Sequence, residues 1–353
     1  MRVILTGGGT GGHIMPLVAV YNELILLSQE TNIPMHITFI GPKSKITLPP
    51  NIHIKTVPAG KFRRYFSLRN IIDIPKIFFG IKISFFYFIA ARPDVIFSKG
   101  GYGSIPAVIA GWLLRVPIIL HESDTIPGLA NKITARFVRN ILVSFPGEYP
   151  QFGKSYTIIG NPVRDMRGGS ADAAKRAFGL SLKKPVLLIL GGSQGAQQVN
   201  ALIEQLLPVL ILKYEIIHQV GEQNVLRGKK FEGYRSQGFF DKEELKNAYA
   251  VADLIISRAG AGIIFEIALV GKPSILIPLM NAAGGHQEKN ALVYKESGAT
   301  EVLINPSPLD LQKTIDAISG DKSRKEKMSK AAKNFARPEA AREIAEQIFN
   351  FAG

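Results

Sequence analysis

Short apolar runs alternate with longer helix-like stretches along almost the whole chain. Buried parallel strands read as continuous apolar runs, and strands separated by helices are typical of doubly wound parallel sheets. The expected strands are Val3–Thr6, Ile37–Ile40, His53–Thr56, Val95–Ser98, Ile118–His121, Ile141–Ser144 and Tyr156–Ile159 in the first half, and Val186–Leu190, Glu215–Gln219, Tyr234–Gly238, Leu254–Ser257, Ser274–Pro278 and Glu301–Ile304 in the second. The pattern predicts an α/β protein.

One local pattern occurs twice, once near the start of each half. Residues 2–13 read RVILTGGGTGGH and residues 185–197 read PVLLILGGSQGAQ, so in both a strand runs into a glycine-rich turn before a helix. Glycines let backbone N–H groups approach an anion closely, and the helix start adds the positive end of its dipole. Two such loops predict two Rossmann-like halves that bind a phosphate-bearing substrate.

The length of the chain also favours two domains, because 353 residues exceed what one core normally uses. The stretch Asn161-Pro162-Val163-Arg164 follows a strand and precedes a polar segment, so it marks the crossing. We expect a Rossmann-like domain over 1–161, a second over 162–337, and a terminal helix over 338–353 that packs back on the first domain.

Composition and charge narrow the classes of function. The chain contains no cysteine, which excludes disulfides, thiolate catalysis and thiolate zinc sites. A formal net charge of +15 indicates an anionic partner. The start MRVIL enters a strand directly and shows no secretory signal pattern, so we expect a cytoplasmic protein.

The segment over residues 74–93 favours a membrane surface, and not nucleic acid, as the anionic partner. It mixes aromatic and basic residues and follows a basic stretch; these are Phe78, Phe79, Phe85, Phe86, Phe88, Lys76, Lys82 and Arg92, preceded by Lys61, Arg63, Arg64 and Arg69. Its longest apolar run is shorter than the ~20 residues that span a bilayer, so the segment would lie on a membrane. A buried amphipathic helix with snorkelling lysines has the same periodicity, and this alternative stays open.

The first glycine loop, Gly7 to Gly12, formally matches the dinucleotide pattern G-x-G-x-x-G. A dinucleotide site also needs an acidic residue after the second strand, where this chain has Gly41-Pro42-Lys43. We therefore interpret the loop as facing a phosphate or diphosphate. His13 follows directly at the helix start, where an imidazole could act on a bound substrate.

The second glycine loop allows a different interpretation. Gly191 to Gly195 matches the G-x-S-x-G elbow of α/β-hydrolases with Ser193 as nucleophile, and Asp253 and His286 follow in the order of that triad. The elbow would, however, lie on the opening strand of its domain, and the first glycine loop would have no role. A hydrolase is the weaker alternative.

A further loop precedes the helix that carries Glu266. The stretch from Ser257 to Gly262 is rich in small residues, which expose helix N–H donors to a diphosphate, and Glu266 can accept both hydroxyls of a ribose. Gln287 opens a later helix, and amides both donate to and accept from sugar hydroxyls. No D-x-D pair occurs, so we expect no metal at the diphosphate.

Together these motifs resemble the MurG family, the N-acetylglucosaminyltransferases that act on undecaprenyl-diphospho-muramoyl-pentapeptide. The motifs, in order along nearly the whole chain, are GGGTGGHIMP, KGGYGSIPA, HESDTIPGLANK, GNPVR, GGSQGAQQVN, SRAGAGIIFEIALVGKPSILIP and HQEKNA. The resemblance implies a GT-B fold that moves GlcNAc from UDP-GlcNAc to the C4 hydroxyl of MurNAc in lipid I. It also implies that the reaction inverts the anomeric centre and takes place at the cytoplasmic face of the membrane.

On the donor side the resemblance implies contacts from both halves and no cofactor. The donor residues that it implies are Thr10, Gly11, Gly12, Arg164, Ser193, Gln194, Phe240, Ala261, Glu266 and Gln287. Among them Glu266 would hold the ribose and Gln287 the GlcNAc hydroxyls, with the backbone near Phe240 at the uracil edge. Arg164 would contact the nucleotide end.

On the acceptor side the resemblance implies His13 as general base, with Glu122 as the next candidate. Tyr102 and Asp124 would line the same side, and many relatives have Asn where this chain has Asp124. Two rivals remain: a UDP-GlcNAc epimerase of the same fold, which has no need of the Phe-rich segment, and a membrane protein that senses the nucleotide without turnover.

Overall fold

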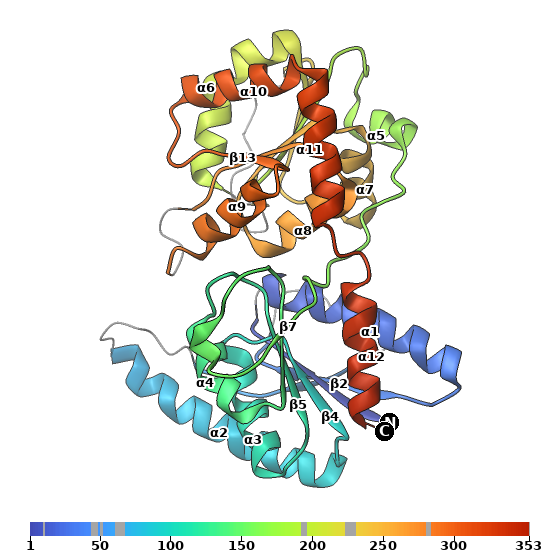
Figure 1. Cartoon of the computed structure of the whole chain (residues 1–353), viewed down its shortest axis with the longest axis vertical. Coiled ribbons are helices and arrows are strands. Elements are labelled where there is room, and N and C mark those ends of the chain that lie inside the picture. Colours follow the sequence, from blue (N-terminus) through green and yellow to red (C-terminus); the bar gives the residue numbers. More distant parts are fainter. Residues whose placement is uncertain are drawn as a thin grey trace. The chain divides into compact units, whose positions relative to one another are not determined.

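The computed structural model describes residues 1–9, 11–43, 49, 52–60, 68–191, 196–222, 231–279 and 284–352. The chain divides into two compact units, which are drawn in Figure 1. Unit 1 consists of Met1–Arg164 together with Pro338–Gly353, and unit 2 of Asp165–Arg337. The division falls after Arg164, whereas the sequence pattern placed it after Asn161.

Unit 1 contains a parallel sheet in which the described residues form seven strands, in the order β3-β2-β1-β4-β5-β6-β7. The strands are β1 (Arg2–Thr6), β2 (His36–Gly41), β3 (His53–Thr56), β4 (Val95–Ser98), β5 (Ile118–Glu122), β6 (Asn140–Val143) and β7 (Thr157–Ile158). The central strands β1 and β4 are buried along nearly their whole length, which explains their continuous apolar sequences.

Helices cover both faces of this sheet. They are α1 (Gly11–Thr31), α2 (Leu68–Ala91), α3 (Ile105–Leu113), α4 (Leu129–Thr134) and α12 (Ala340–Ala352), with short 3₁₀ turns η1 (Tyr102–Ser104), η2 (Ala135–Phe137) and η3 (Pro150–Phe152). Alternate residues of β1 point to opposite faces. Val3 packs with α1 and α12, whereas Ile4 packs with α2 and α3.

The chain returns to unit 1 through α12. This helix lies beside α1, as Figure 1 shows, and buries Ile344 and Ile348 in the same cluster as Leu17 and Val20 of α1. Arg342 of α12 donates to Glu30 of α1 at 2.6 Å, near the surface. The last helix is therefore part of the first core.

Unit 2 repeats the architecture, with the strand order β10-β9-β8-β11-β12-β13 among its described residues. The strands are β8 (Val186–Leu190), β9 (Glu215–Gln219), β10 (Tyr234–Gln237), β11 (Leu254–Ser257), β12 (Ser274–Leu276) and β13 (Thr300–Val302). The helices are α5 (Ala171–Phe178), α6 (Gln197–Lys213), α7 (Lys242–Val251), α8 (Ala261–Val270), α9 (His286–Glu296), α10 (Pro308–Ser319) and α11 (Lys322–Phe335).

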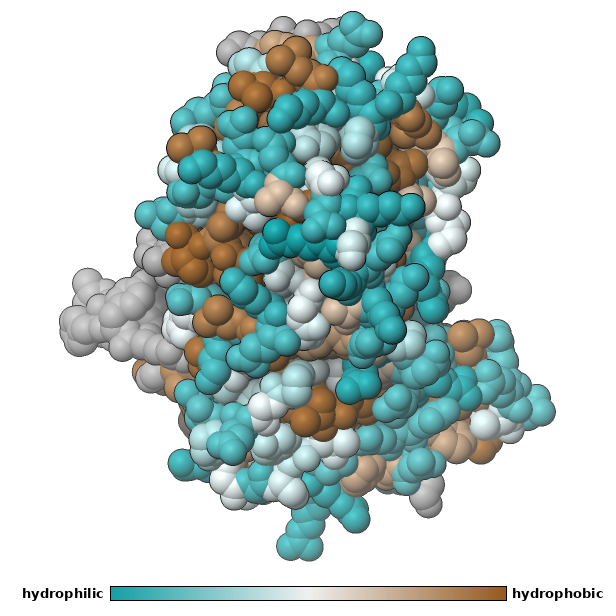
Figure 2. Space-filling model, turned by 45° about the horizontal axis from the view of Figure 1, so that its top comes forward, coloured by the Kyte–Doolittle hydropathy of each residue, from teal (hydrophilic) through white to brown (hydrophobic). Residues whose placement is uncertain are grey.

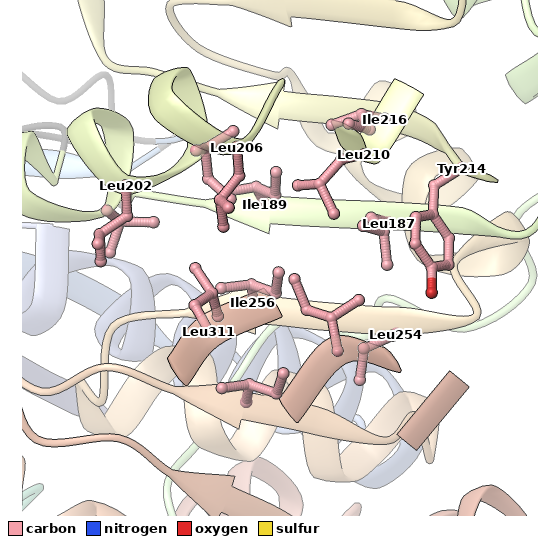
Figure 3. Close-up of a cluster of buried hydrophobic side chains, with 14 of the residues drawn as sticks. Leu187, Ile189, Leu202, Leu206, Leu210, Tyr214, Ile216, Leu254, Ile256 and Leu311 are labelled. Carbon is pink, nitrogen blue, oxygen red and sulfur yellow. The ribbon is translucent and has the colours of Figure 1, made fainter. Parts of the chain in front are cut away.

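A buried hydrophobic cluster of unit 2 lies between its sheet and the helices α6 and α10. Figure 3 shows Leu202, Leu206 and Leu210 of α6 pointing toward Leu187 and Ile189 of β8. Their spacing of three to four residues places them on one face of the helix. The two parallel α/β units confirm the predicted fold class.

In each sheet the strand order reverses direction once, between β1 and β4 in unit 1 and between β8 and β11 in unit 2. Ligands of open α/β sheets bind outside the carboxyl ends of the strands at such a switch point. The first glycine loop follows β1, and the loop before α8 follows β11. The topology therefore places both loops where a ligand is expected.

Two described helices are long and apolar enough to cross a membrane by length and composition: α1, and the part of α2 over Asp73–Ala91. Both helices also pack against the sheet of unit 1. The α2 stretch has only 17% of its apolar window buried, against 44% for α1. Core helices of soluble proteins pass the same test, so this is weak evidence for a span.

The predicted Phe-rich segment has two faces. Phe88 is only 1% exposed and Phe85 packs against the same core, so including them in a lipid-facing set was wrong; helical geometry turns them toward the sheet. Phe78, Phe79 and Phe86 are 75%, 63% and 59% exposed. On the view in Figure 2, apolar side chains reach the surface in separate patches within a largely hydrophilic exterior.

Candidate active site

The first glycine loop packs closely on the loop that follows β4. The Gly8 N–H donates to the carbonyl of Gly100 at 2.9 Å, and the Lys99 N–H donates to that of Thr6 at 2.8 Å. A Cβ on Gly103 would lie 2.5 Å from the carbonyl oxygen of Gly7. Glycine is thus needed because two backbones touch at the switch point.

These two loops enclose the imidazole of His13, which lies in the first turn of α1. A Cβ on Gly8 would lie 3.0 Å from Nδ1, and one on Gly101 would lie 2.9 Å from Nε2. Burial, followed by the positive charge of Lys99, lowers the pKa of His13 to about 4, and Asp124 acts in the opposite direction. His13 is neutral near pH 7 and can accept a proton.

A buried polar cluster lies beside His13. Lys99, only 1% exposed, has its Nζ 2.7 Å from Nδ1 of His121 and also donates to Oγ of Ser123. Nε2 of His121 lies 2.8 Å from the carbonyl of Gly160. A carbonyl only accepts, so Nε2 carries the ring proton and Nδ1 accepts from Lys99.

Glu122, the second candidate base, is buried and has partners on both carboxylate oxygens. Oε1 accepts from the Asp124 N–H at 3.0 Å, and Oε2 accepts from the Gly128 N–H at 3.0 Å and from Nδ2 of Asn131 at 2.8 Å. Burial and the charge of Asp124 raise the pKa of Glu122, while the N–H donors and Lys99 oppose that shift. These contacts shape the loop after β5.

The remaining candidates of unit 1 lie around the same strand ends. Gly11 and Gly12 begin α1, and a Cβ on Gly9 would lie 3.6 Å from the hydroxyl of Tyr102 in η1. Asp124 follows β5, whose neighbour is β4. Thr10 lies outside the described residues. The structure therefore brings His13, Tyr102, Glu122 and Asp124 to one edge of the sheet.

In unit 2, α8 begins beyond Gly260 without a side-chain cap. A Cβ on Gly260 or on Gly262 would meet no described atom within 4 Å, so there is space at this helix start. Ala261 lies in the first turn, and its small side chain keeps the N–H groups accessible. An uncapped helix start with space before it suits an anion such as a diphosphate.

Glu266 lies further along α8 and accepts a hydrogen bond from the hydroxyl of Tyr249, at 3.2 Å, through Oε2. Gln287 lies in the first turn of α9, where its Oε1 accepts from the Leu279 N–H at 3.1 Å. Nδ2 of Asn290 donates to the carbonyl of Ala259 at 3.3 Å, which ties α9 to the loop before α8. Glu266 is therefore held by Tyr249 of α7, and Gln287 by the loop after β12.

Four other predicted contacts remain: Phe240, Arg164, Ser193 and Gln194. Phe240, 2% exposed, packs edge-on against Phe178, so only its backbone is available to a ligand. Arg164 is the last residue of unit 1. Ser193 and Gln194 lie outside the described residues. The hydrolase alternative depends on Ser193 as nucleophile, so its elbow lies outside them as well. Among the residues described, no group of three or more His, Asp or Glu is placed to hold a metal ion.

The sequence interpretation missed two residues of the cluster, Lys99 and Asn131. Asn131 connects the glycine loops to Glu122, because its Oδ1 accepts from the Gly101 N–H at 3.2 Å while its Nδ2 donates to Glu122. Both residues stand in motifs that were noticed, KGGYGSIPA and HESDTIPGLANK. A lysine directly after an apolar strand and before two glycines was the available signal.

Two family models match the chain on either side of the crossing. The N-terminal domain of glycosyltransferase family 28 matches residues 3–143, and the C-terminal domain of that family matches residues 186–347. The chain belongs to glycosyltransferase family 28. This membership confirms the prediction of a sugar-transferring enzyme with two Rossmann-like domains.

Relatives in family 28 extend over nearly the full length. A protein of Bacillus cereus is 38% identical over 98% of this chain and 99% of its own; its name is UDP-N-acetylglucosamine–N-acetylmuramyl-(pentapeptide) pyrophosphoryl-undecaprenol N-acetylglucosamine transferase 2. A Geobacillus kaustophilus transferase named for the same reaction is 38% identical, covering 94% of both chains. The resemblance to the MurG family is thereby confirmed.

Solved structures agree on the fold. MurG of Acinetobacter baumannii has a TM-score of 0.75 and 23% identity, with 99% of each chain covered. UDP-GlcNAc 2-epimerase of Neisseria meningitidis has a TM-score of 0.68 and 12% identity, covering 99% of this chain and 100% of its own. The architecture is shared by transferases and epimerases, so the fold alone does not separate them.

Proposed function

We propose that this protein transfers N-acetylglucosamine from UDP-GlcNAc to the C4 hydroxyl of MurNAc in lipid I, with inversion, and so forms lipid II for peptidoglycan. The observation that carries the proposal is the 38% identity to transferases of this reaction over 98% of the chain. The enclosed imidazole of His13 supports it, since acceptor activation needs a neutral base at the strand ends.

The donor would be held mainly by unit 2. The diphosphate would lie at the N-terminus of α8, where Gly260 and Gly262 leave space and the backbone N–H groups are available. The ribose hydroxyls would bind Glu266, and the amide of Gln287 would contact the sugar. Arg164, Ser193 and Gln194 would add contacts from the crossing and from the second glycine loop.

In the transfer step His13 would take the proton from the C4 hydroxyl while that oxygen attacks the anomeric carbon. The bond between the anomeric carbon and the diphosphate oxygen breaks on the opposite face, and UDP leaves with the electron pair. Helix N–H donors would stabilise the growing negative charge on the leaving group without a metal.

The lipid acceptor requires contact with a membrane, which we assign to unit 1. The exposed residues of α2, Phe78, Phe79, Phe86 and Ile74, form an apolar face beside Lys76 and Lys82. Near the end of α3 a pocket of about 370 Å³ is lined by Trp112 and Phe137 with Arg115, Arg136 and Arg139. Aromatic and basic residues together suit an anionic lipid surface, so we place the enzyme on the inner face of the cell membrane.

The proposal is tested by incubating the protein with UDP-GlcNAc carrying a label in the sugar, with and without a lipid I analogue. A transferase forms labelled disaccharide and free UDP only with the acceptor. Interconversion of the labelled sugar nucleotide without acceptor would instead identify an epimerase, and binding without any turnover would identify a sensing protein. Either of these two results would overturn the proposal.

A further inference from the structure

We propose that Lys99 is a positioning residue for the transfer: its backbone N–H and its buried side chain tie the end of β1, before the first glycine loop, to the loop after β5, and so set the surroundings of the His13 ring. The inference rests on the proposed function for the role of His13. It concerns a residue that neither the sequence motifs nor the comparisons assign to any role.

The position of Lys99 is fixed from both ends. Its backbone N–H binds the carbonyl of Thr6 at the end of β1, and its side chain reaches His121 and Ser123 at the end of β5. The three strands involved are neighbours in the sheet, in the order β1-β4-β5. Lys99 therefore connects the end of β1, where the first glycine loop begins, with the loop after β5.

The side chain of Lys99 lies close to that of His13. A Cβ on Gly7 would lie 3.5 Å from Cβ of Lys99 and 3.6 Å from Cβ of His13, so both side chains flank this glycine. A Cβ on Gly8 or on Gly101 would press on the ring of His13, and the Gly8 N–H donates to the carbonyl of Gly100, the residue after Lys99. Movement of Lys99 would therefore move the glycines that surround the His13 ring.

The hydrogen-bond partners of the Lys99 side chain are acceptors, as an ammonium requires. Because His121 donates its Nε2 proton to Gly160, its Nδ1 is an acceptor, and the Ser123 hydroxyl oxygen accepts as well. Burial lowers the pKa of Lys99 to about 7, and the carboxylates of Glu122 and Asp124 oppose that shift. As the pH falls, Lys99 takes up its proton before His13 does.

The two charged groups that face His13 have opposite effects on its pKa. Lys99, at the end of β4, disfavours the imidazolium, and Asp124, after β5, favours it. The phenol of Tyr102 lies against the same glycine loop. With Lys99 removed, burial still lowers the pKa of His13, but the opposing charge of Asp124 is no longer balanced by a positive charge, so the pKa of His13 rises part of the way toward its ordinary value.

The test compares Lys99→Met, which keeps the length and apolar stem without the charge, with Lys99→Arg, which keeps a charge. The protonation of His13 is followed by NMR of histidine-labelled protein, with the His13 signal assigned from a His13→Gln variant. In Lys99→Met we expect the His13 titration to move to higher pH by on the order of one pH unit. The acid limb of kcat moves with it, and kcat at its plateau falls by about 10-fold to 100-fold.

Lys99→Arg is the matched control and should keep the low titration of His13. If Lys99→Met does not fold, Ser123→Ala carries the test, because it removes one acceptor of the ammonium; the His13 titration then moves in the same direction by less. An unchanged His13 titration in folded Lys99→Met, or in Ser123→Ala, overturns the inference. Since NMR needs no turnover, this result is independent of whether the transfer activity itself is found.

Discussion

At the scale of residues, the proposed transfer depends on a neutral imidazole at His13. His13 is flanked by Gly8 and Gly101, and any larger residue at either position would press on its ring. Glu122 differs, because its oxygens already accept three hydrogen bonds. The geometry therefore favours His13 over Glu122 as the base.

We expect His13→Ala to lower kcat by roughly 10² to 10⁴, the usual range for loss of a general base, with UDP-GlcNAc affinity near that of the wild type. Steady-state kinetics with both substrates saturating, and calorimetry with the donor, measure the two quantities. His53→Ala is the matched control, because His53 is exposed on β3 of the same unit. Undiminished turnover in His13→Ala would assign the base to another residue.

We expect Glu266→Ala to weaken UDP-GlcNAc binding by about 1–3 kcal/mol, because a charged partner of the ribose hydroxyls is lost. Tyr249→Phe, which removes only the phenol that donates to Glu266, should weaken binding by less. Calorimetry and the melting temperature without ligand are measured for both. A collapse of stability with intact donor affinity per folded molecule would make Glu266 a structural residue.

The sequence identified His13, Tyr102, Glu122 and Asp124, and the structure brings them to neighbouring strand ends. It could not reveal Lys99 and Asn131 as parts of the cluster, since their contacts join segments far apart in the chain. The partners of Lys99 and Asn131 are known only once β4 and β5 pair. A carboxylate such as Glu122 looks the same in sequence whether its oxygens face substrate or backbone N–H groups.

At the scale of elements, the strands were the most predictable part. Buried parallel strands are continuous apolar runs, and β8, β9 and β11 begin and end where the pattern placed them. The end of β12 differs from the prediction. This strand stops at Leu276, two residues before Pro278, because proline lacks the N–H that a strand ladder needs.

Helix α2 was less predictable, because a buried and a lipid-facing phenylalanine have the same periodicity. Its aromatic residues divide by helical geometry: Phe88 packs under the sheet, and Phe78 and Phe79 face outward. Only the tertiary packing against α3 decides which face is covered.

We expect Phe78→Ser combined with Phe79→Ser to reduce sedimentation of the protein with anionic vesicles, because the apolar face that would enter the interface is removed. Higher salt should weaken binding of the wild type as well, since basic residues contribute. Leu212→Ser is the control, a 72% exposed leucine on α6 of unit 2. Equal vesicle binding by the double variant and the wild type would remove α2 from the membrane contact.

At the scale of the whole molecule, three histidines with lowered pKa values link stability to pH. Burial lowers the pKa of His13 to about 4 and of His218 to about 3, and lowers that of His121 well below its ordinary value. These groups are protonated in the unfolded chain below about pH 6.5 but not in the folded one. Folding therefore opposes proton uptake, and acid destabilises the protein.

We expect the free energy of unfolding to fall as the pH is lowered from about 6.5 toward 4, by about 1.4 kcal/mol per pH unit for each such histidine. Glu122, whose pKa is raised, offsets part of this slope. Chemical denaturation at a series of pH values measures it. His218→Gln should reduce the slope for unit 2, and stability that stays level or rises on acidification would contradict the neutral state of these histidines.

The central claim, acceptor attack assisted by His13, is tested most directly by the stereochemistry of the disaccharide made from UDP-α-GlcNAc and a lipid I analogue in excess chelator. The anomeric proton coupling of the product, read by NMR, distinguishes the two configurations. We expect a β-linked product, formed at an undiminished rate without metal and greatly slowed in His13→Ala. An α-linked product, or activity that requires an added divalent cation, would contradict direct metal-free displacement.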